Sequence, residues 1–279
     1  LTSYVNTSEN FLFADTLSYA KQKQNLQEIG FRMNKQHQID CSQFKKVQSI
    51  VIYTNENIKH LNFLPQQLTS FRMKGWSQNV DLKNLNNLNL KSLSLERIQF
   101  ISFLKNGKLQ LLESLEIINC QVPSFNFLEF CENLQNLNLQ RCPNFKNLQL
   151  IKNMKKLKSL NLRNCDLICD LFNCQFLTEL TWIDVSCSLV KNLSYLASCH
   201  NLKTVKAEHC RIKSGLNKLR KNGVDVSVSQ EITSQSYNLG FNGDLKRIYS
   251  LKHPKQVQAQ GKLFHFNDYN FKKQYHGGR

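Results

Sequence analysis

Acidic residues are scarce in this sequence: 20 Asp and Glu stand against 37 Lys and Arg, which leaves a formal net charge of +17. Proline and glycine are also rare, at 4 and 10 residues, and this composition excludes a collagen-like or low-complexity chain. No apolar run approaches the roughly 18 residues needed to cross a bilayer. We therefore expect a folded protein that does not span a membrane and has anionic neighbours, such as nucleic acid, lipid head groups or acidic protein surfaces.

The sequence motifs of common catalytic and metal sites are missing as well. There is no G-x-S-x-G, no phosphate-binding G-x-x-x-x-G-K-[ST] and no H-E-x-x-H. The cysteines that lie closest together, Cys165, Cys169 and Cys174, do not have the C-x-x-C spacing of zinc ribbons. We therefore expect no enzymatic activity, no bound metal and no cofactor.

What the chain does contain is a recurring phrase, seen most clearly as LQNLNLQRC at 134–142 and LKSLNLRNC at 157–165. The second and third apolar residues alternate as on a strand and point to a core, while the following segment has an apolar residue at every third position, typical of a 3₁₀ or helical return. The period is near 22, with successive spacings of 21, 22, 22, 22, 23, 20 and 25 residues. The copies begin at Val47, Leu68, Leu90, Leu112, Leu134, Leu157, Leu177 and Leu202.

An L-x-x-L-x-L phrase with this period resembles the leucine-rich repeat family, from about residue 47 to 229. The resemblance implies an α/β solenoid: an arc of about eight coils with a parallel sheet on its concave side. Residues 1–46 are expected to form an N-terminal cap with a helix between Phe11 and Phe31, which covers the exposed edge of the first coil. At the other end we expect a last helix at 214–222, a closing strand at 224–229 and an extended tail at 230–279.

Seven of the ten cysteines fall at fixed places in the repeat. A metal site, a disulfide ladder, a nucleophile and simple packing are the alternatives for such residues. Because cysteine-rich caps are missing, we favour buried, reduced thiols in an intracellular compartment. Four lie after L-x-x-L-x-L-x-x and three lie three residues before a first leucine, namely Cys120, Cys142, Cys165 and Cys210, and Cys131, Cys174 and Cys199.

The residues beside the core leucines are predicted to face outward on the concave side. Their charge is mixed, with cations early, acids in the middle and Glu179 and Glu208 late, separated by Ser, Thr and Asn. This pattern does not favour a uniform nucleic-acid trough and suits a protein partner. The predicted protein-binding residues are Arg72, Lys74, Glu96, Glu116, Asn136, Asn138, Gln140, Asn161 and Arg163.

Positive charge is concentrated elsewhere. Residues 141–163 hold seven Lys and Arg and no acid, mostly on the return side, and residues 230–279 hold eight against three acids, interleaved with aromatics. These features predict contact with a polyanion or a partner; a solvated surface and a free tail are the alternatives. The predicted contact residues are Arg141, Lys146, Lys152, Lys155, Lys156, Lys246, Arg247, Phe264, Phe266, Tyr269, Lys272, Lys273, Tyr275 and Arg279.

Three functions fit these patterns. The first is a non-catalytic architectural subunit of a large intracellular assembly, bound to other protein subunits and to RNA if that assembly is a mitochondrial ribosome. The basic charge and a first residue, Leu1, that suits removal of a transit peptide favour a mitochondrial location over the cytoplasm. The second follows from the short repeats with Cys in the turn, which are similar to those of the mitochondrial coupling-factor B family and imply an accessory subunit of a respiratory complex or the ATP synthase. The third is a cytosolic adaptor.

Overall fold

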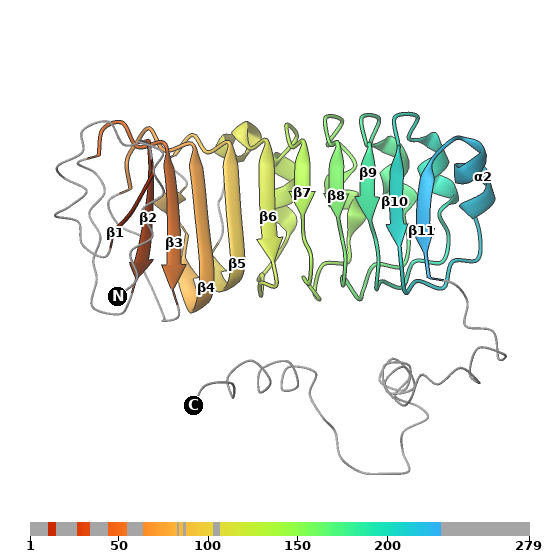
Figure 1. The fold of residues 1–279 in the computed structure, drawn as a ribbon, viewed down its shortest axis with the longest axis horizontal. Helices are drawn as coiled ribbons and strands as arrows, with labels where there is room; N and C mark the ends of the chain where they lie inside the picture. Colours follow the sequence, from red (N-terminus) through yellow and green to blue (C-terminus); the bar gives the residue numbers. More distant parts are fainter. Residues whose placement is uncertain are drawn as a thin grey trace, which may run out of the picture. The chain divides into compact units, whose positions relative to one another are not determined.

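The structure is a computed structural model, and it describes residues 11–14, 27–33, 44–54, 64–102 except 83, 86 and 87, and 107–229. Within these residues, eleven parallel strands form one sheet in the order in which they occur along the chain (Figure 1). The strands are β1 (Phe11–Ala14), β2 (Glu28–Met33), β3 (Ser49–Thr54), β4 (Ser70–Asp81), β5 (Ser92–Ser102), β6 (Ser114–Ile118), β7 (Asn136–Asn138), β8 (Ser159–Asn161), β9 (Trp182–Asp184), β10 (Thr204–Ala207) and β11 (Asp225–Val228).

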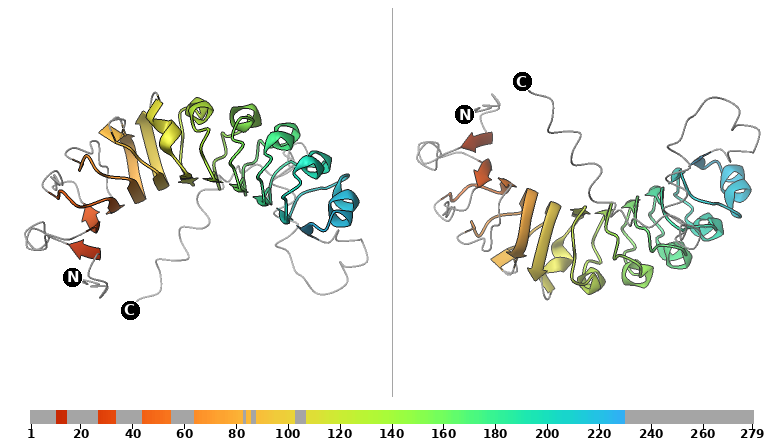
Figure 2. Two further views of the ribbon diagram at one scale, coloured as in Figure 1. Left: turned by 90° about the horizontal axis from the view of Figure 1, so that it is seen from above. Right: turned by 90° about the horizontal axis from the view of Figure 1, so that it is seen from below.

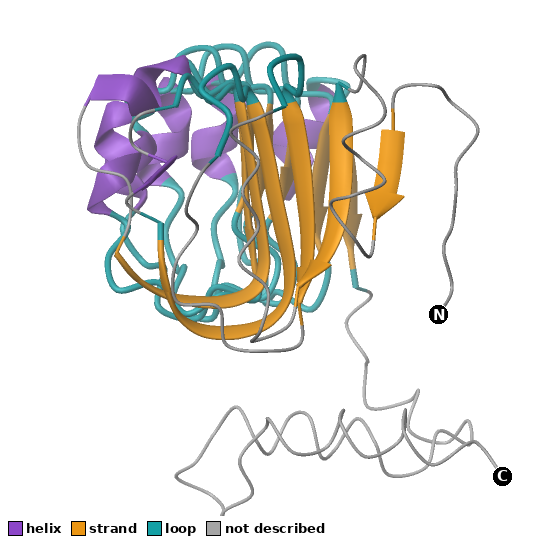
Figure 3. Cartoon of the chain, turned by 90° about the vertical axis from the view of Figure 1, so that its left-hand side faces the viewer, coloured by secondary structure: helices purple, strands orange, loops and turns teal. Residues whose placement is uncertain are grey.

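From β6 to β10, each strand is followed by a return segment that leads back to the start of the next strand. In the second half of the sheet these segments contain a short helix, and the sheet lines the concave side while the helices form the convex side (Figures 2 and 3). The last helix is a short α-helix and the others are 3₁₀ helices. They are η2 (Gly107–Leu111), η3 (Asn126–Phe130), η4 (Leu148–Ile151), η5 (Phe172–Phe176), η6 (Ser194–Ser198) and α2 (Leu216–Lys221).

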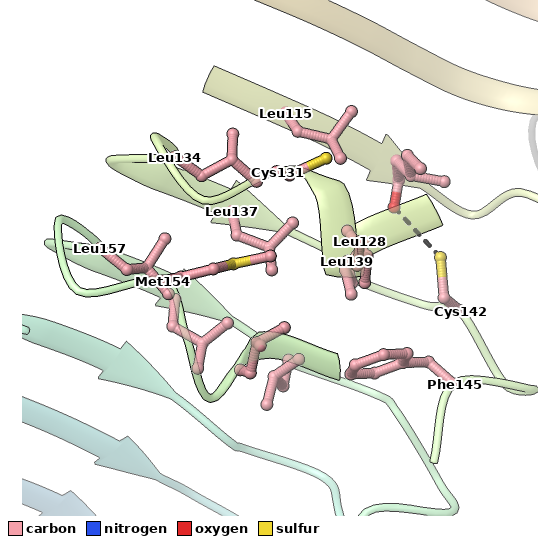
Figure 4. Packing of buried hydrophobic residues seen from close by; sticks show 14 of the residues in the cluster. Leu115, Leu128, Cys131, Leu134, Leu137, Leu139, Cys142, Phe145, Met154 and Leu157 are labelled. Carbon is pink, nitrogen blue, oxygen red and sulfur yellow. Dashed lines mark hydrogen bonds between the residues drawn. The ribbon is translucent and has the colours of Figure 1, made fainter. Parts of the chain in front are cut away.

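A single continuous core runs between the sheet and the return segments (Figure 4). In the coil that begins at Leu134, Leu137 and Leu139 are at most 1% exposed, as the repeat predicts. The return residues Phe145 and Met154 close the same layer at 1% exposure each. Burial of one such side chain stabilises the fold by about 1.5–3 kcal/mol, but only if the neighbouring coils supply the walls.

A side-chain hydrogen bond precedes four successive return helices. In each case the side-chain oxygen of a Ser, Asn or Asp accepts a hydrogen bond from the backbone N–H two residues later, which stabilises the tight entry into the 3₁₀ turn. The accepting residues are Ser124, Asn147, Asp170 and Asn192, at N···O distances of 3.2, 3.0, 3.1 and 2.8 Å. Asn147 is itself the N-cap of η4, and the other three lie one residue before the N-cap.

A residue with positive φ follows the strand in five successive coils, and in the coil before them it lies within β5, at Arg97. The φ angles lie between 53° and 60°, in the left-handed region that costs most L residues about 1–2 kcal/mol. The backbone N–H groups of Asn119, Arg141 and Asn164 donate to the carbonyls of Gln140, Arg163 and Ser186 in the following coil, at 2.9 Å each. The turn therefore links neighbouring coils. The six residues are Arg97, Asn119, Arg141, Asn164, Cys187 and His209.

The seventh copy of the repeat starts three residues later than the sequence predicts. Leu160 pairs with Ile183 across the sheet, and Ile183 pairs with Val205. The copy therefore begins at Leu180, and the spacings around it become 23 and 22 in place of 20 and 25. As a consequence Glu179 lies in the turn before β9, not on the concave side.

The N-terminal region also differs from the prediction. A helix is wrong for both described ends of the segment 11–31, because β1 and β2 continue the parallel sheet there. The spacing that starts the repeat is present in this stretch, since Leu26, Ile29 and Phe31 precede Val47, Ile50 and Ile52 by 21 residues. Residues 15–26 lie outside the described part of the chain.

The C-terminal end of the array agrees with the sequence reading. Helix α2 lies within the predicted 214–222, and β11 lies within 224–229. Gly223 has φ +79°, the left-handed conformation expected of a helix C-terminal glycine. The predicted extension at 230–279 lies outside the described residues.

Candidate binding surface

The concave face of the sheet consists of rows of side chains, because parallel strands in register place equivalent residues side by side. The first row is formed almost entirely by small hydroxyl and amide side chains, from β3 to β8. At β9 the row reaches Trp182, and it continues with Thr204 on β10. The row contains Ser49, Ser70, Ser92, Ser114, Asn136, Ser159, Trp182 and Thr204.

The second row brings together four of the residues that the sequence predicts for protein binding. Arg72, Glu116, Asn138 and Asn161 align across the sheet with Ser94 between the first two. The Ser94 hydroxyl donates to the Glu116 carboxylate at 2.8 Å. These predicted residues therefore do share one face of the molecule.

Two of the predicted asparagines also form hydrogen bonds with the backbone of their own coil. The side-chain oxygens of Asn138 and Asn161 accept hydrogen bonds from the backbone N–H groups of Gln140 and Arg163, at 3.1 and 3.0 Å. Each bond stabilises the turn by which the chain leaves the strand, two residues after the asparagine. The amide nitrogens of these side chains take no part in these two bonds.

The third row runs along the same face and has charge at both ends. Tyr53, which is 37% exposed, is the register partner of Lys74, and Lys74 forms an ion pair of 2.8 Å with Glu96. Further along, Gln140 and Arg163 occupy the equivalent places after β7 and β8. Lys74 and Glu96 are therefore already paired with each other on this surface.

A charged cluster of which the sequence predicts only Arg163 and Glu208 lies around the end of β9. The Arg163 guanidinium is 3.9 Å from the Asp184 carboxylate and 3.6 Å from that of Glu208. Lys206 Nζ lies 5.9 Å from the centre of the Trp182 ring. The three-residue error in the seventh copy explains the omission, because that register assigns Trp182 to the core and leaves Asp184 without a place on the concave face.

Five of the predicted polyanion contacts lie within the described residues. Arg141 lies in the loop after β7, Lys152 follows η4, and Lys155 and Lys156 lie in the turn before β8, at the opposite edge of the coil. Together with Lys146, these four residues lie at different places around a single coil. The other predicted contacts, from Lys246 to Arg279, lie outside the described residues.

The repeated cysteines are packing residues, as predicted. Six are buried, while Cys210 is partly exposed; Cys174 lies within η5, so it is not in the position that Cys131 and Cys199 share. Burial raises the pKa of the Cys120 thiol to about 11, which keeps it protonated and unreactive at neutral pH. In the described ranges no three His, Cys, Asp or Glu side chains are grouped to hold a metal ion, and no helix has the length and apolar character to cross a membrane.

No family model matches the sequence, and none of the curated proteins compared with it matches either. Solved structures do match. An LRR protein of Leptospira interrogans, LIC12759, superimposes with a TM-score of 0.60 at 18% identity, over 77% of this chain and 64% of its own. An internalin, InlF, from Listeria monocytogenes gives a TM-score of 0.56 at 17% identity, over 67% of this chain and 57% of its own.

A chain in the structure of the Drosophila Toll–Spatzle complex also matches, with a TM-score of 0.55 at 16% identity, over 72% of this chain and 30% of its own. This chain thus has the leucine-rich repeat fold, as the period of its leucines predicts. It spans less than two thirds of the length of each of these three proteins.

Proposed function

We propose that this chain is a non-catalytic binding subunit that holds a segment of a protein partner on its concave face. The observation that carries the proposal is the row of small hydroxyl and amide side chains that leads to Trp182. A flat polar floor beside an indole lets a partner backbone approach closely, and tryptophan and arginine are the residues that most often dominate binding energy in interfaces. The solved structure with Toll shows the same fold in a complex with another protein, Spatzle.

The charges around Trp182 favour a protein partner over a polyanion. Arg163 and Lys206 alternate with Asp184 and Glu208, so the field of the cluster is mixed in sign. Alternating charges select a partner of complementary pattern and repel a uniformly charged one. A nucleic acid would place phosphates next to the Glu208 carboxylate, which is the more exposed of the two acids.

The proposal also concerns the assembly to which the chain belongs and the compartment in which that assembly lies. The net charge of +17 supports a place beside an anionic component, and a mitochondrial assembly, with the ribosome favoured, is our first hypothesis. An accessory subunit of a respiratory complex or the ATP synthase is the second hypothesis, and a cytosolic adaptor is the third. Co-purification after nuclease treatment separates them: loss of the complex points to RNA, and co-migration with a solubilised membrane complex points to the second.

The concave site is tested by substitution of Trp182 in the full chain. We expect Trp182→Ala to lower the recovery of the co-purified protein partner at least tenfold while the thermal unfolding midpoint changes little, because the indole is only half-buried. Phe130→Ala is the matched control, since Phe130 is a 47% exposed aromatic residue on the convex side. Retention of every partner by the Trp182 variant would overturn the proposal.

A further inference from the structure

Three aromatic side chains form an exposed cluster on the convex side of the solenoid. Phe172 and Phe176 belong to η5 and are 45% and 39% exposed, and Tyr195 belongs to η6 in the next coil. The rings of Phe172 and Phe176 meet edge to face at 6.0 Å, and those of Phe172 and Tyr195 at 5.4 Å. These contacts join two neighbouring coils into one apolar surface.

The repeat does not require aromatic residues at these places. Phe172 donates its backbone N–H to Asp170, two residues earlier, and the equivalent donors in the coils on either side are Gln149 and Ser194. Phe176 ends its helix where the next coil has Ser198. The core beneath is already filled by Cys174, which is 0% exposed. Packing of the coil therefore does not explain why aromatic residues occupy these exposed positions. Exposed apolar clusters of this kind mark interaction sites.

A lysine contacts the cluster. Lys155 Nζ donates to the Phe176 carbonyl at 2.9 Å and lies 5.3 Å from the centre of the Phe176 ring. Along the chain, Lys152 directly follows η4 and Lys191 comes three residues before η6. The carboxylate of Asp170 accepts the backbone N–H of Phe172.

We propose that the cluster of Phe172, Phe176 and Tyr195 is a second docking site, which binds a short acidic segment of a protein partner through an apolar side chain of that segment. The apolar side chain packs on the rings, and its acidic neighbours pair with Lys155, Lys152 and Lys191. This site lies on the face opposite to the concave surface, so it goes beyond the function proposed above. It lets the solenoid hold two partners at once.

Charge decides which occupant fits. A second copy of this chain carries the same net charge of +17, and the segment 230–279 carries eight Lys and Arg against three acids, so both repel a lysine border. RNA is attracted by the lysines but needs an open ring face on which a base can stack. The Phe176 ring has Lys155 above it, and the ring of Phe172 is engaged edge to face by two neighbours. An acidic peptide can bind here without stacking on the open face of a ring.

The test uses the full chain and a displayed library of random 12-residue peptides. Binders selected on the wild type are re-measured on a Phe172→Asn/Phe176→Asn variant, which keeps the net charge. We expect a class of peptides, rich in Asp and Glu with at least one Leu or aromatic residue, to bind this variant at least tenfold more weakly. The same peptides should bind Trp182→Ala and Phe130→Ala as tightly as the wild type.

A variant with a single substitution controls for misfolding of the double variant. Lys155→Glu leaves the rings in place and should weaken the same peptides at least fivefold, while circular dichroism and the unfolding midpoint of all variants stay near the wild type. The proposal is overturned if no peptide class depends on Phe172 and Phe176, if the class that does is neutral or basic, or if a 12-nucleotide RNA binds in its place and is lost in the variant. Loss of peptides in Trp182→Ala alone would locate binding on the concave face, and so would count against this site without affecting the first proposal.

Discussion

The thiol of Cys142 donates a hydrogen bond of 3.1 Å to the backbone carbonyl of Ile117, one coil earlier in the sheet. The same relationship recurs along the array, always from the slot after the strand to the third apolar residue of the preceding coil. The thiol is thus both a small core residue and a donor between coils. The other pairs are Cys120 with Leu95, Cys165 with Leu139 and Cys210 with Val185, at 3.4, 3.1 and 3.1 Å.

Substitution of Cys142 separates packing from hydrogen bonding. We expect Cys142→Ala to lower the free energy of unfolding by about 1–3 kcal/mol, because it removes a donor and leaves a small cavity. Cys142→Ser should cost less, since the hydroxyl still donates and the array already has Ser188 in the equivalent place. Urea unfolding of both variants measures the difference. Equal losses would assign the whole effect to volume.

High pH should destabilise the fold through the buried thiols. Burial raises the pKa of Cys120 to about 11 and that of Cys165 to about 12, from a usual value of 9.0. Because the folded pKa lies above the unfolded one, this stability is fully present below pH 9 and is lost as the pH rises toward 11–12. The slope is at most about 1.4 kcal/mol per pH unit for each thiol.

Urea unfolding at pH 8, 9 and 10 measures this loss. Tyr and Lys side chains also titrate in that range, so the informative quantity is the difference between the wild type and Cys165→Ser. The variant has one titrating thiol fewer and should lose stability less steeply above pH 9. Parallel curves would show that the thiol is not shielded in the way its burial predicts.

Two glycines with positive φ should respond very differently to alanine. A Cβ at Gly75, where φ is +140°, would lie 1.5 Å from the carbonyl oxygen of Thr54 in the neighbouring strand. Gly75→Ala must therefore move β3 or β4, and we expect a loss of about 3 kcal/mol or more. Gly223 has φ +79° and nothing within 4 Å, so Gly223→Ala should cost only about 1 kcal/mol. Thermal and urea unfolding of the pair test the contrast.

The left-handed turn residues offer a stabilising substitution. Arg141 has φ 58°, which glycine adopts without the steric cost that other residues meet. We expect Arg141→Gly to raise the free energy of unfolding by up to about 1 kcal/mol, and Arg141→Val to lower it by about 1–2 kcal/mol. The inter-coil hydrogen bond from the Arg141 N–H to Arg163 is made by backbone and should survive in both. A valine variant as stable as the wild type would contradict this account.

Leucine spacing was enough to predict the coils around Leu134 and Leu157, because their apolar residues fit one register only. It was not enough between Leu171 and Val185, where Leu177 begins an L-x-x-L phrase and Leu180 begins an L-x-x-I phrase. The choice between them is made by pairing, since Ile183 completes a layer with Leu160 and Val205. The concave cluster at Trp182 depends on that choice, and so it is visible only when the strands are placed side by side.

The strand order also gives the distance between side chains along the concave face. Tyr53 on β3 and Trp182 on β9 are six strand steps apart, which at roughly 4.8 Å per step is about 29 Å along the sheet. A partner segment that touches both rings must reach that far, which takes about 19 residues of α-helix or about nine of extended chain. Shorter segments can engage only one end. The number of coils between the two aromatic side chains therefore sets a minimum length for whatever is bound across the whole face.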